Sequence, residues 1–184
     1  MSLTPSNMLP LGTIAPSFTL VDTISNKKMS LHELKSPVAT VIMFICNHCP
    51  YVKHIENELV KFVKAYQASN INFIAINSND TTRYPDDAPD KMQETAKKLG
   101  FTFPYLFDET QAVAKVYQAA CTPDFYIFDK DLRCVYRGQF DDARPGNHIP
   151  VTGNSMRAAL ENILAGKSVD AEQKPSVGCN IKWK

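Results

Sequence analysis

The chain has 184 residues, of which 44% are hydrophobic and 21% are charged, and its formal net charge is +1. This composition is typical of a globular protein and excludes a disordered chain, a collagen or a coiled coil. Its 20 basic residues nearly balance its 19 acidic ones, so it lacks the basic excess of a nucleic-acid-binding protein. The length predicts one domain, 1–184, that ends in a tail from about residue 166.

The first half of the chain predicts a βαβ unit. Ser17–Val21 alternates weakly, which favours a short strand, and His32–Leu34 is predicted to be a helical turn. Val38–Ile45 is apolar and β-branched, which is typical of a strand buried on both faces, and it is far too short for a membrane span. Tyr51–Ala68 has apolar residues at helical spacing, and Ile71–Ile76 is the next strand. Strands joined through a helix in this way are expected to be parallel.

The second half of the chain predicts shorter elements and two irregular loops. In chain order these are a polar loop (Asn77–Pro89), a helix (Asp90–Leu99), a short edge strand (Tyr105–Phe107), a short helix (Gln111–Ala119), an antiparallel hairpin (Phe125–Phe128 and Cys134–Tyr136), a second loop (Asp141–Gly153) and a last helix (Asn154–Leu164). This order predicts an α/β fold, with a central mixed sheet and helices on both faces.

The motif Cys46-Asn47-His48-Cys49 lies between the buried strand and the long helix. Residues three apart share a helix face, so the two sulfurs are expected within disulfide range. The helix N-terminus offers unpaired N–H groups and the positive end of the dipole, which favour a thiolate. Because Cys46 comes first, we expect it to be the more exposed, attacking thiol. Cys49 is expected inside the helix as the shielded, resolving thiol.

Other interpretations of this motif fit the sequence less well. A haem attachment motif needs a histidine directly after the second cysteine, and residue 50 is proline. A zinc site needs a second pair of ligands, and the remaining cysteines are scattered singly. A CxxC that arises by chance has no reason to lie between a strand and a helix. The context therefore favours redox chemistry.

A second feature agrees with redox chemistry, because Thr122-Pro123 stands directly before the hairpin, where an X-Pro bond can be cis at modest cost. A CxxC after a buried strand and a Thr-Pro before a hairpin resemble the thioredoxin superfamily. Gly12–Leu20 is similar to the G-x-x-A-P-x-F opening of its AhpC/TSA, or redoxin, branch. Three segments resemble a peroxiredoxin-like, thioredoxin-fold subgroup: Phe44–Val52, Asp141–Asn147 and Pro175–Trp183. The resemblance implies a thioredoxin-like fold, with a cis-proline beside the two sulfurs.

Some positions depart from these families. Thioredoxins have a tryptophan just before the first cysteine and a buried aspartate six residues before it, where this chain has Ile45 and Thr40. The hydroxyl residue and the proline that precede the reactive cysteine of peroxiredoxins are missing, whichever cysteine is counted from. The pair therefore indicates disulfide exchange rather than peroxide reduction. His48 is similar to the histidine of Cys-Pro-His-Cys in oxidising disulfide enzymes, where it can stabilise the nearby thiolate.

The other cysteines have two interpretations each. Cys121, close to Pro123, is either near the pair as a third redox thiol or a small buried hydrophobic residue. Cys179, in the tail, is either inert or a third redox thiol. Cys134 alternates with other strand residues and is expected in the core. We expect Val177–Trp183 to dock on the body of the protein, because burying Trp183 would gain about 1.5–3 kcal/mol. If the tail docks near the pair, Cys179 could form a disulfide with Cys46 or Cys121.

No metal and no bound cofactor are expected. Copper bound by Cys46, Cys49 and His148 would suit soft thiolates and imidazole, but the related copper-chaperone pattern spaces its cysteines by three residues. The acidic residues of the first loop lack the spacing of a calcium loop and are interpreted as solvated. These residues are Asp80, Asp86, Asp87 and Asp90.

These features predict a thiol–disulfide oxidoreductase whose redox pair is Cys46 and Cys49, supported by His48, Thr122 and Pro123. The alternatives are a peroxiredoxin-like thiol peroxidase and a metal-binding or non-catalytic module. The expected partners are a protein or small-molecule disulfide and a thiol reductant, without nucleic acid or membrane, and the oligomeric state stays open. The N-terminus shows no basic or apolar leader, which predicts a cytoplasmic protein, or a periplasmic one if a leader has been removed.

Overall fold

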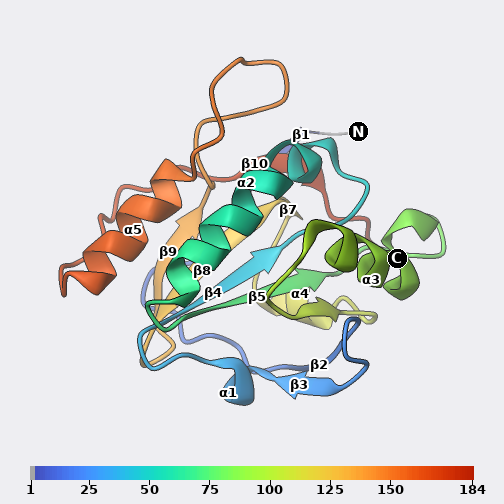
Figure 1. Ribbon diagram of the computed structural model, residues 1–184, viewed down its shortest axis with the longest axis horizontal. Coiled ribbons are helices and arrows are strands. Elements are labelled where there is room, and N and C mark those ends of the chain that lie inside the picture. Colours follow the sequence, from blue (N-terminus) through green and yellow to red (C-terminus); the bar gives the residue numbers. More distant parts are fainter. Residues whose placement is uncertain (1–2) are drawn as a thin grey trace.

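The computed structural model describes residues 3–184, which form a large central sheet and a small second sheet (Figure 1). The strands of the central sheet lie in the order β3 (Lys28–Ser30), β2 (Thr19–Asp22), β6 (Tyr105–Phe107), β5 (Ile71–Asn77), β4 (Ala39–Phe44), β8 (Asp124–Asp129) and β9 (Cys134–Gly138). β5 is parallel to both β4 and β6, and the other neighbouring strands in this sheet are antiparallel. The predicted mixed sheet and its parallel βαβ unit are therefore confirmed.

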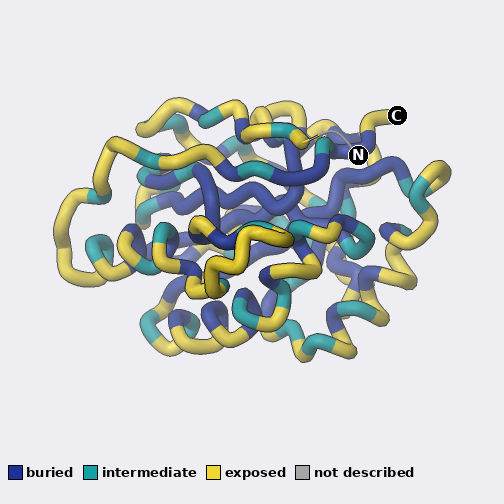
Figure 2. The backbone as a smooth tube through the Cα atoms, turned by 90° about the horizontal axis from the view of Figure 1, so that it is seen from above, coloured by how far each residue is buried: buried dark blue, intermediate teal, exposed yellow. Residues whose placement is uncertain are grey.

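Strand β4 is buried throughout because helices cover both faces of the sheet. Val41 and Met43 face the cluster that contains α2 (Pro50–Gln67), α3 (Pro89–Leu99) and α5 (Asn154–Leu164). Ile42 and Phe44 face the cluster that contains α1 (Leu31–Leu34) and α4 (Ala112–Val116). The buried centre and the exposed outer turns of the helices are visible in Figure 2. None of the described helices combines the length and apolar character needed to span a bilayer.

One strand lies in a different place from that predicted. Strand β6 was expected at the edge of the sheet, but it pairs with β5 on one side and with β2 on the other. The prediction was wrong because the antiparallel pair β2–β3, which precedes the βαβ unit in the chain, adds on outside β6. A single sequence does not show on which side of a sheet an early strand pairs.

The C-terminal tail docks on the body of the protein, as predicted. Its strand β10 (Val177–Asn180) lies between β1 (Leu3–Pro5) and β7 (Cys121–Thr122) in the small sheet, close to the start of α2 (Figure 1). Ile181 is 1% exposed, but Trp183 is 36% exposed, so the expectation that the tryptophan anchors the tail by its burial is wrong. Backbone pairing of β10 and the buried Ile181 hold the tail instead.

Candidate active site

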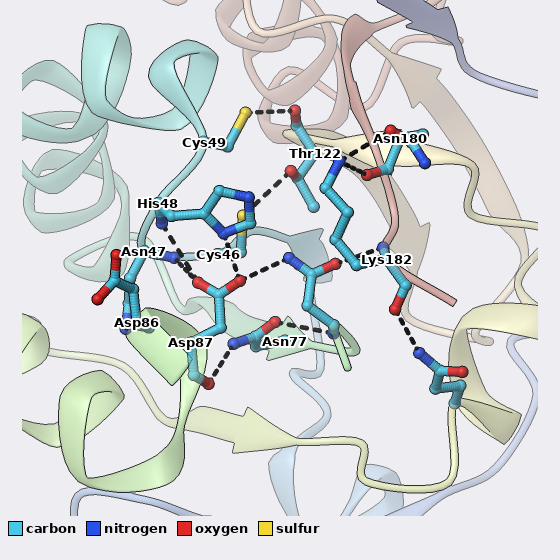
Figure 3. Close-up of polar contacts among 12 residues, drawn as sticks. Cys46, Asn47, His48, Cys49, Asn77, Asp86, Asp87, Thr122, Asn180 and Lys182 are labelled. Carbon is cyan, nitrogen blue, oxygen red and sulfur yellow. Dashed lines mark hydrogen bonds and ion pairs between the residues drawn. The ribbon is translucent and has the colours of Figure 1, made fainter. Parts of the chain in front are cut away.

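The two cysteines of the motif lie where β4 ends and α2 begins (Figure 3). Cys49 is the N-cap of α2 and Pro50 its first residue. The prediction that Cys49 lies inside the helix is therefore wrong by one position. Pro50 explains the difference, because a proline without an N–H group is suited to the first helical position. Cys49 is still placed at the positive end of the helix dipole.

Both sulfur-bearing residues are buried. Cys46 is 2% exposed and Cys49 is 0% exposed, and both are free thiols. The expectation that Cys46 is the more exposed residue is therefore wrong. Exposure does not distinguish the two thiols, because Thr122 contacts both of them and the imidazole of His48 lies beside Cys46 (Figure 3).

Thr122 connects the motif to the small sheet. The Thr122–Pro123 peptide bond is cis. The hydroxyl Oγ1 of Thr122 lies 3.3 Å from Cys46 Sγ, and the Cys49 thiol donates to the Thr122 carbonyl oxygen at 3.2 Å. The predicted site residues Cys46, Cys49, Thr122 and Pro123 are therefore brought together, and one threonine fixes the position of both sulfurs.

His48 is oriented by a residue that the sequence analysis missed. Asp87, at the end of the short 3-10 helix η1 (Pro85–Asp87), is 0% exposed, and its Oδ2 lies 2.5 Å from His48 Nδ1. When Nδ1–H donates a hydrogen bond to this carboxylate, the neutral ring keeps a lone pair on Nε2. Nε2 is buried and has no hydrogen-bond partner among the described residues. The ring stacks on Tyr84 at 5.2 Å.

The interpretation of the first loop as uniformly solvated is wrong, because Asp80 and Asp87 are buried, although Asp86 and Asp90 are exposed. The topology could have indicated Asp87. Strands β4 and β5 are parallel, so the loop after β5 and the motif after β4 meet at the same edge of the sheet. Burial raises the pKa of Asp87, but hydrogen bonds from His48 and Asn79 outweigh it and hold that pKa below its usual value.

Cys46, His48 and Asp87 also offer a sulfur, a nitrogen and an oxygen within 4.8 Å of one another. A metal ion would need free lone pairs on the carboxylate. Asp87 Oδ1 already accepts the backbone N–H groups of Asn47 and His48, at 2.8 and 3.2 Å, and Oδ2 accepts from His48 Nδ1 and from Asn79 Nδ2. A carboxylate accepts about four hydrogen bonds, so Asp87 suits an orienting role better than a ligand role.

The two thiols of the motif have opposite pKa shifts. A hydrogen bond from Cys46 lowers the pKa of Cys49 to about 5, in spite of burial, and a hydrogen bond from Cys179 contributes. Burial raises the pKa of Cys46 well above its usual value, and the hydrogen bond to Cys49 and the charge of Asp87 raise it further. The first negative charge of the reduced pair is therefore favoured on Cys49, and Cys46 stays protonated to higher pH.

The other three cysteines have different environments. Cys134 is 1% exposed in β9, where it packs in the core as predicted. Cys121 is 0% exposed, its Sγ lies 3.8 Å from the Pro123 carbonyl oxygen, and burial raises its pKa far above the usual value. Cys179 belongs to the same buried cluster as Cys46 and Cys49. It lies directly opposite Thr122 in the small sheet, and burial and the interaction with Cys49 raise its pKa to about 12, so Cys49 joins Cys46 and Cys121 as a nearby thiol.

The proposed copper ligand His148 is exposed, in the loop that follows β9. Among the described residues, the histidine that shares a group of three ligand atoms with Cys46 is His48. The histidine beside the cysteines is therefore His48, and not the His148 of the copper hypothesis.

Asp124, directly after the cis-proline, is a buried acid on the other face of the sheet. Its Oδ2 accepts hydrogen bonds from Ser6 Oγ at 3.0 Å and from Tyr126 Oη at 2.9 Å. Tyr126 belongs to the cluster opposite the thiols. Burial raises the pKa of Asp124 to about 7, although these hydrogen bonds oppose the shift.

This raised pKa predicts how stability depends on pH. Between about pH 4 and pH 7 the folded state binds one more proton than the unfolded state, so the free energy of unfolding falls as pH rises. The loss is about 4 kcal/mol at most, from about 1.4 kcal/mol for each pKa unit. Asp124→Asn is expected to remove this part of the pH dependence in urea unfolding at several pH values. The exposed Asp131→Asn serves as the control, and an unchanged slope in Asp124→Asn would contradict the assignment.

The AhpC/TSA family model matches residues 11–137. No curated protein matches the chain. A conserved protein from Geobacillus kaustophilus is 59% identical over 100% of this chain and 97% of its own, with a TM-score of 0.99. A protein from Sinorhizobium meliloti 1021 is 46% identical over 98% of both chains, with a TM-score of 0.95.

A more distant structure shares the fold. The thioredoxin domain of a thiol-disulfide oxidoreductase from Bacteroides vulgatus is 14% identical, with a TM-score of 0.63 over 81% of this chain and 96% of its own. At this identity the similarity shows the fold alone. The central mixed sheet with helices on both faces is therefore a thioredoxin-like fold.

Proposed function

Because the chain belongs to the AhpC/TSA family and has a thioredoxin-like fold, we propose that it is a thiol–disulfide oxidoreductase whose redox pair is Cys46 and Cys49. The observation that carries this proposal is the position of the two sulfurs. They belong to one buried cluster at the start of α2, and both are in contact with Thr122. Two thiols so placed can become one disulfide and release two electrons and two protons.

The exchange takes two steps. Cys46 Sγ attacks one sulfur of a substrate disulfide, which forms a mixed disulfide and releases the other substrate sulfur as a thiolate. The Cys49 thiolate then attacks Cys46 Sγ, forms the Cys46–Cys49 bond and expels the second substrate thiolate. The substrate gains two electrons and the protein loses two. A thiol reductant reverses the same steps and restores the pair.

His48 and Asp87 supply the proton transfer that Cys46 needs. The carboxylate of Asp87 holds Nδ1–H of His48 and leaves the lone pair of Nε2 as the proton acceptor for Cys46, whose Sγ lies within 4.8 Å of a His48 ring nitrogen. The imidazolium that forms is stabilised by the buried charge of Asp87. His48 then returns the proton to the substrate thiolate that leaves. Thr122 Oγ1, 3.3 Å from Cys46 Sγ, can donate a hydrogen bond to the developing thiolate.

The substrate is expected to approach from the side of His48. A surface hollow of about 340 Å³ is bordered there by Asn47 and His48 and by charged side chains of both signs from α2 and α3. Because Cys46 is 2% exposed, a local movement at the site must precede contact between a substrate sulfur and Cys46. The proposed partners are a disulfide substrate and a thiol reductant. We propose that the protein acts in the cytoplasm, where thiols are kept reduced.

A turnover comparison tests this proposal. The purified protein is supplied with a thiol reductant and, in parallel, with oxidised glutathione, insulin or hydrogen peroxide. We expect reduction of a disulfide substrate that depends on Cys46, and Cys134→Ala is the matched control for loss of a buried cysteine outside the site. Peroxide consumption without disulfide reduction would instead support a thiol peroxidase, the second activity compatible with the family.

A further inference from the structure

We propose that Cys179 is a third redox thiol, which takes Cys49 as its disulfide partner and thereby releases Cys46. The proposal rests on the function proposed above and deepens it. It gives the C-terminal tail a chemical role beyond docking. The sequence pattern left the role of Cys179 open, and the structure places it beside the redox pair.

The register of the small sheet places Cys179 on the side of the redox pair. Cys179 in β10 lies directly opposite Thr122 in β7. Side chains of directly opposed residues point to the same face, about 4.5–5.5 Å apart at Cβ. The Thr122 side chain contacts Cys46 and the Thr122 carbonyl oxygen contacts Cys49, so Cys179 faces the redox pair.

The C-terminal tail approaches β7 closely. A Cβ atom at position 178 would lie 2.1 Å from the Thr122 carbonyl oxygen, so glycine is needed there for β10 to approach β7. Lys182, a few residues on, donates from its backbone N–H to Asn79 Oδ1 at 2.8 Å. The tail is therefore held on both sides of Cys179, and this thiol is 3% exposed.

Contacts also define the order of the three sulfurs. Cys49 hydrogen-bonds Cys46 and also hydrogen-bonds Cys179, so Cys49 lies between the two other thiols in the chain of contacts. Thiol–disulfide exchange needs this arrangement, in which the attacking sulfur approaches a central sulfur and a third sulfur leaves. Cys179 can attack Cys49, but the structure shows no contact of Cys179 with Cys46.

The exchange balances without an external oxidant. The Cys179 thiolate attacks Cys49 Sγ in the Cys46–Cys49 disulfide, the Cys49–Cys179 bond forms, and Cys46 leaves as a thiolate. One disulfide is broken and one is formed, so the oxidation state of the protein is unchanged. The proton lost by Cys179 passes to solvent, and Cys46 takes one up through His48.

Oxidation of the pair makes Cys179 a better nucleophile. In the reduced protein, burial raises the pKa of Cys179 to about 12, and the hydrogen bond to Cys49 and its negative charge add to this effect. The nearby charge of Lys182 lowers it. When Cys49 enters a disulfide its charge disappears, while the effect of Lys182 remains. The exchange is therefore favoured by formation of the first disulfide.

Disulfide mapping of the full chain tests the proposal. The protein is oxidised with oxidised glutathione, kept at pH 8.5, quenched with acid, unfolded, and labelled with N-ethylmaleimide at mildly acidic pH before proteolysis and mass spectrometry. In part of the molecules we expect Cys46 instead of Cys179 to carry the N-ethylmaleimide label. The same molecules should give a peptide linked through Cys49 and Cys179. The variant Cys179→Ser should show only the Cys46–Cys49 link, and Cys134→Ala should behave like the wild type.

The other outcomes are equally informative. A Cys46–Cys49 link in every oxidised molecule, with the label always on Cys179, overturns the exchange and leaves the proposed function intact. If neither link forms, the proposed function fails, and the exchange fails with it because it starts from the Cys46–Cys49 bond.

Discussion

Cys46→Ser is expected to reduce turnover of a disulfide substrate to background, whereas Cys49→Ser is expected to accumulate a stable mixed disulfide on Cys46. In Cys49→Ser, Cys46 loses two effects that raise its pKa, the hydrogen bond to Cys49 and the nearby thiolate charge. Cys46 can therefore still attack the substrate, but no thiolate remains to resolve the product. In Cys46→Ser, Cys49 loses the hydrogen bond that lowers its pKa most.

The mixed disulfide is measured as an added substrate mass on the peptide that contains residue 46. Cys134→Ala again serves as the control, because its thiol lies in the core away from the site. An adduct on Cys49 in Cys46→Ser, at the rate seen for Cys46 in Cys49→Ser, would reverse the roles of the two thiols. The lower pKa of Cys49 by itself would predict this reversal. The experiment therefore shows whether thiol acidity or access to the substrate decides which cysteine attacks.

Asp87→Asn is expected to lower the rate of disulfide attack by about 10²–10⁴-fold, the range typical of a lost general acid or base. The amide nitrogen would face His48 Nδ1 and Asn79 Nδ2, which both donate to the carboxylate. His48 would then accept at Nδ1 and carry its proton on Nε2, so it could no longer take a proton from Cys46.

The ¹⁵N chemical shifts of the His48 ring report this change of tautomer, which a purely structural loss would not produce. Asp86→Asn is a close control, because Asp86 is exposed and contacts Asn47 only through its backbone carbonyl. Wild-type rates in Asp87→Asn, or an unchanged His48 tautomer, would show that Asp87 does not orient the imidazole. A parallel unfolding measurement separates lost activity from the cost of about 1–3 kcal/mol for unsatisfied buried groups.

The central part of the fold could be predicted from the sequence because its elements are long and periodic. Val38–Ile45 is apolar except for Thr40, and the helix after it repeats its apolar residues at helical spacing. These patterns placed the motif between a strand and a helix, and this position identified Cys46 and Cys49. The small sheet could not be predicted, because β1, β7 and β10 each have four residues or fewer, too few to show alternation.

Some of the site depends on contacts between distant segments, which a local pattern does not contain. Asp87 is a loop residue by composition and becomes buried only because its loop folds over the motif. The burial of Cys46 and the approach of Cys179 to Cys49 likewise depend on the cis-proline turn and the docked tail. The sequence could therefore indicate the candidate redox pair, but not the relative acidity of its two thiols or the residue that orients His48.

The reduction potential of the Cys46–Cys49 pair tests the central claim most directly. The protein is equilibrated in a series of glutathione redox buffers, quenched with acid, and mapped for disulfides by mass spectrometry. We predict a reversible two-electron transition that links Cys46 to Cys49, at a potential between about −270 and −120 mV, the range of thioredoxin-fold oxidoreductases. Free thiols on both Cys46 and Cys49 in the most oxidising buffer would contradict the account.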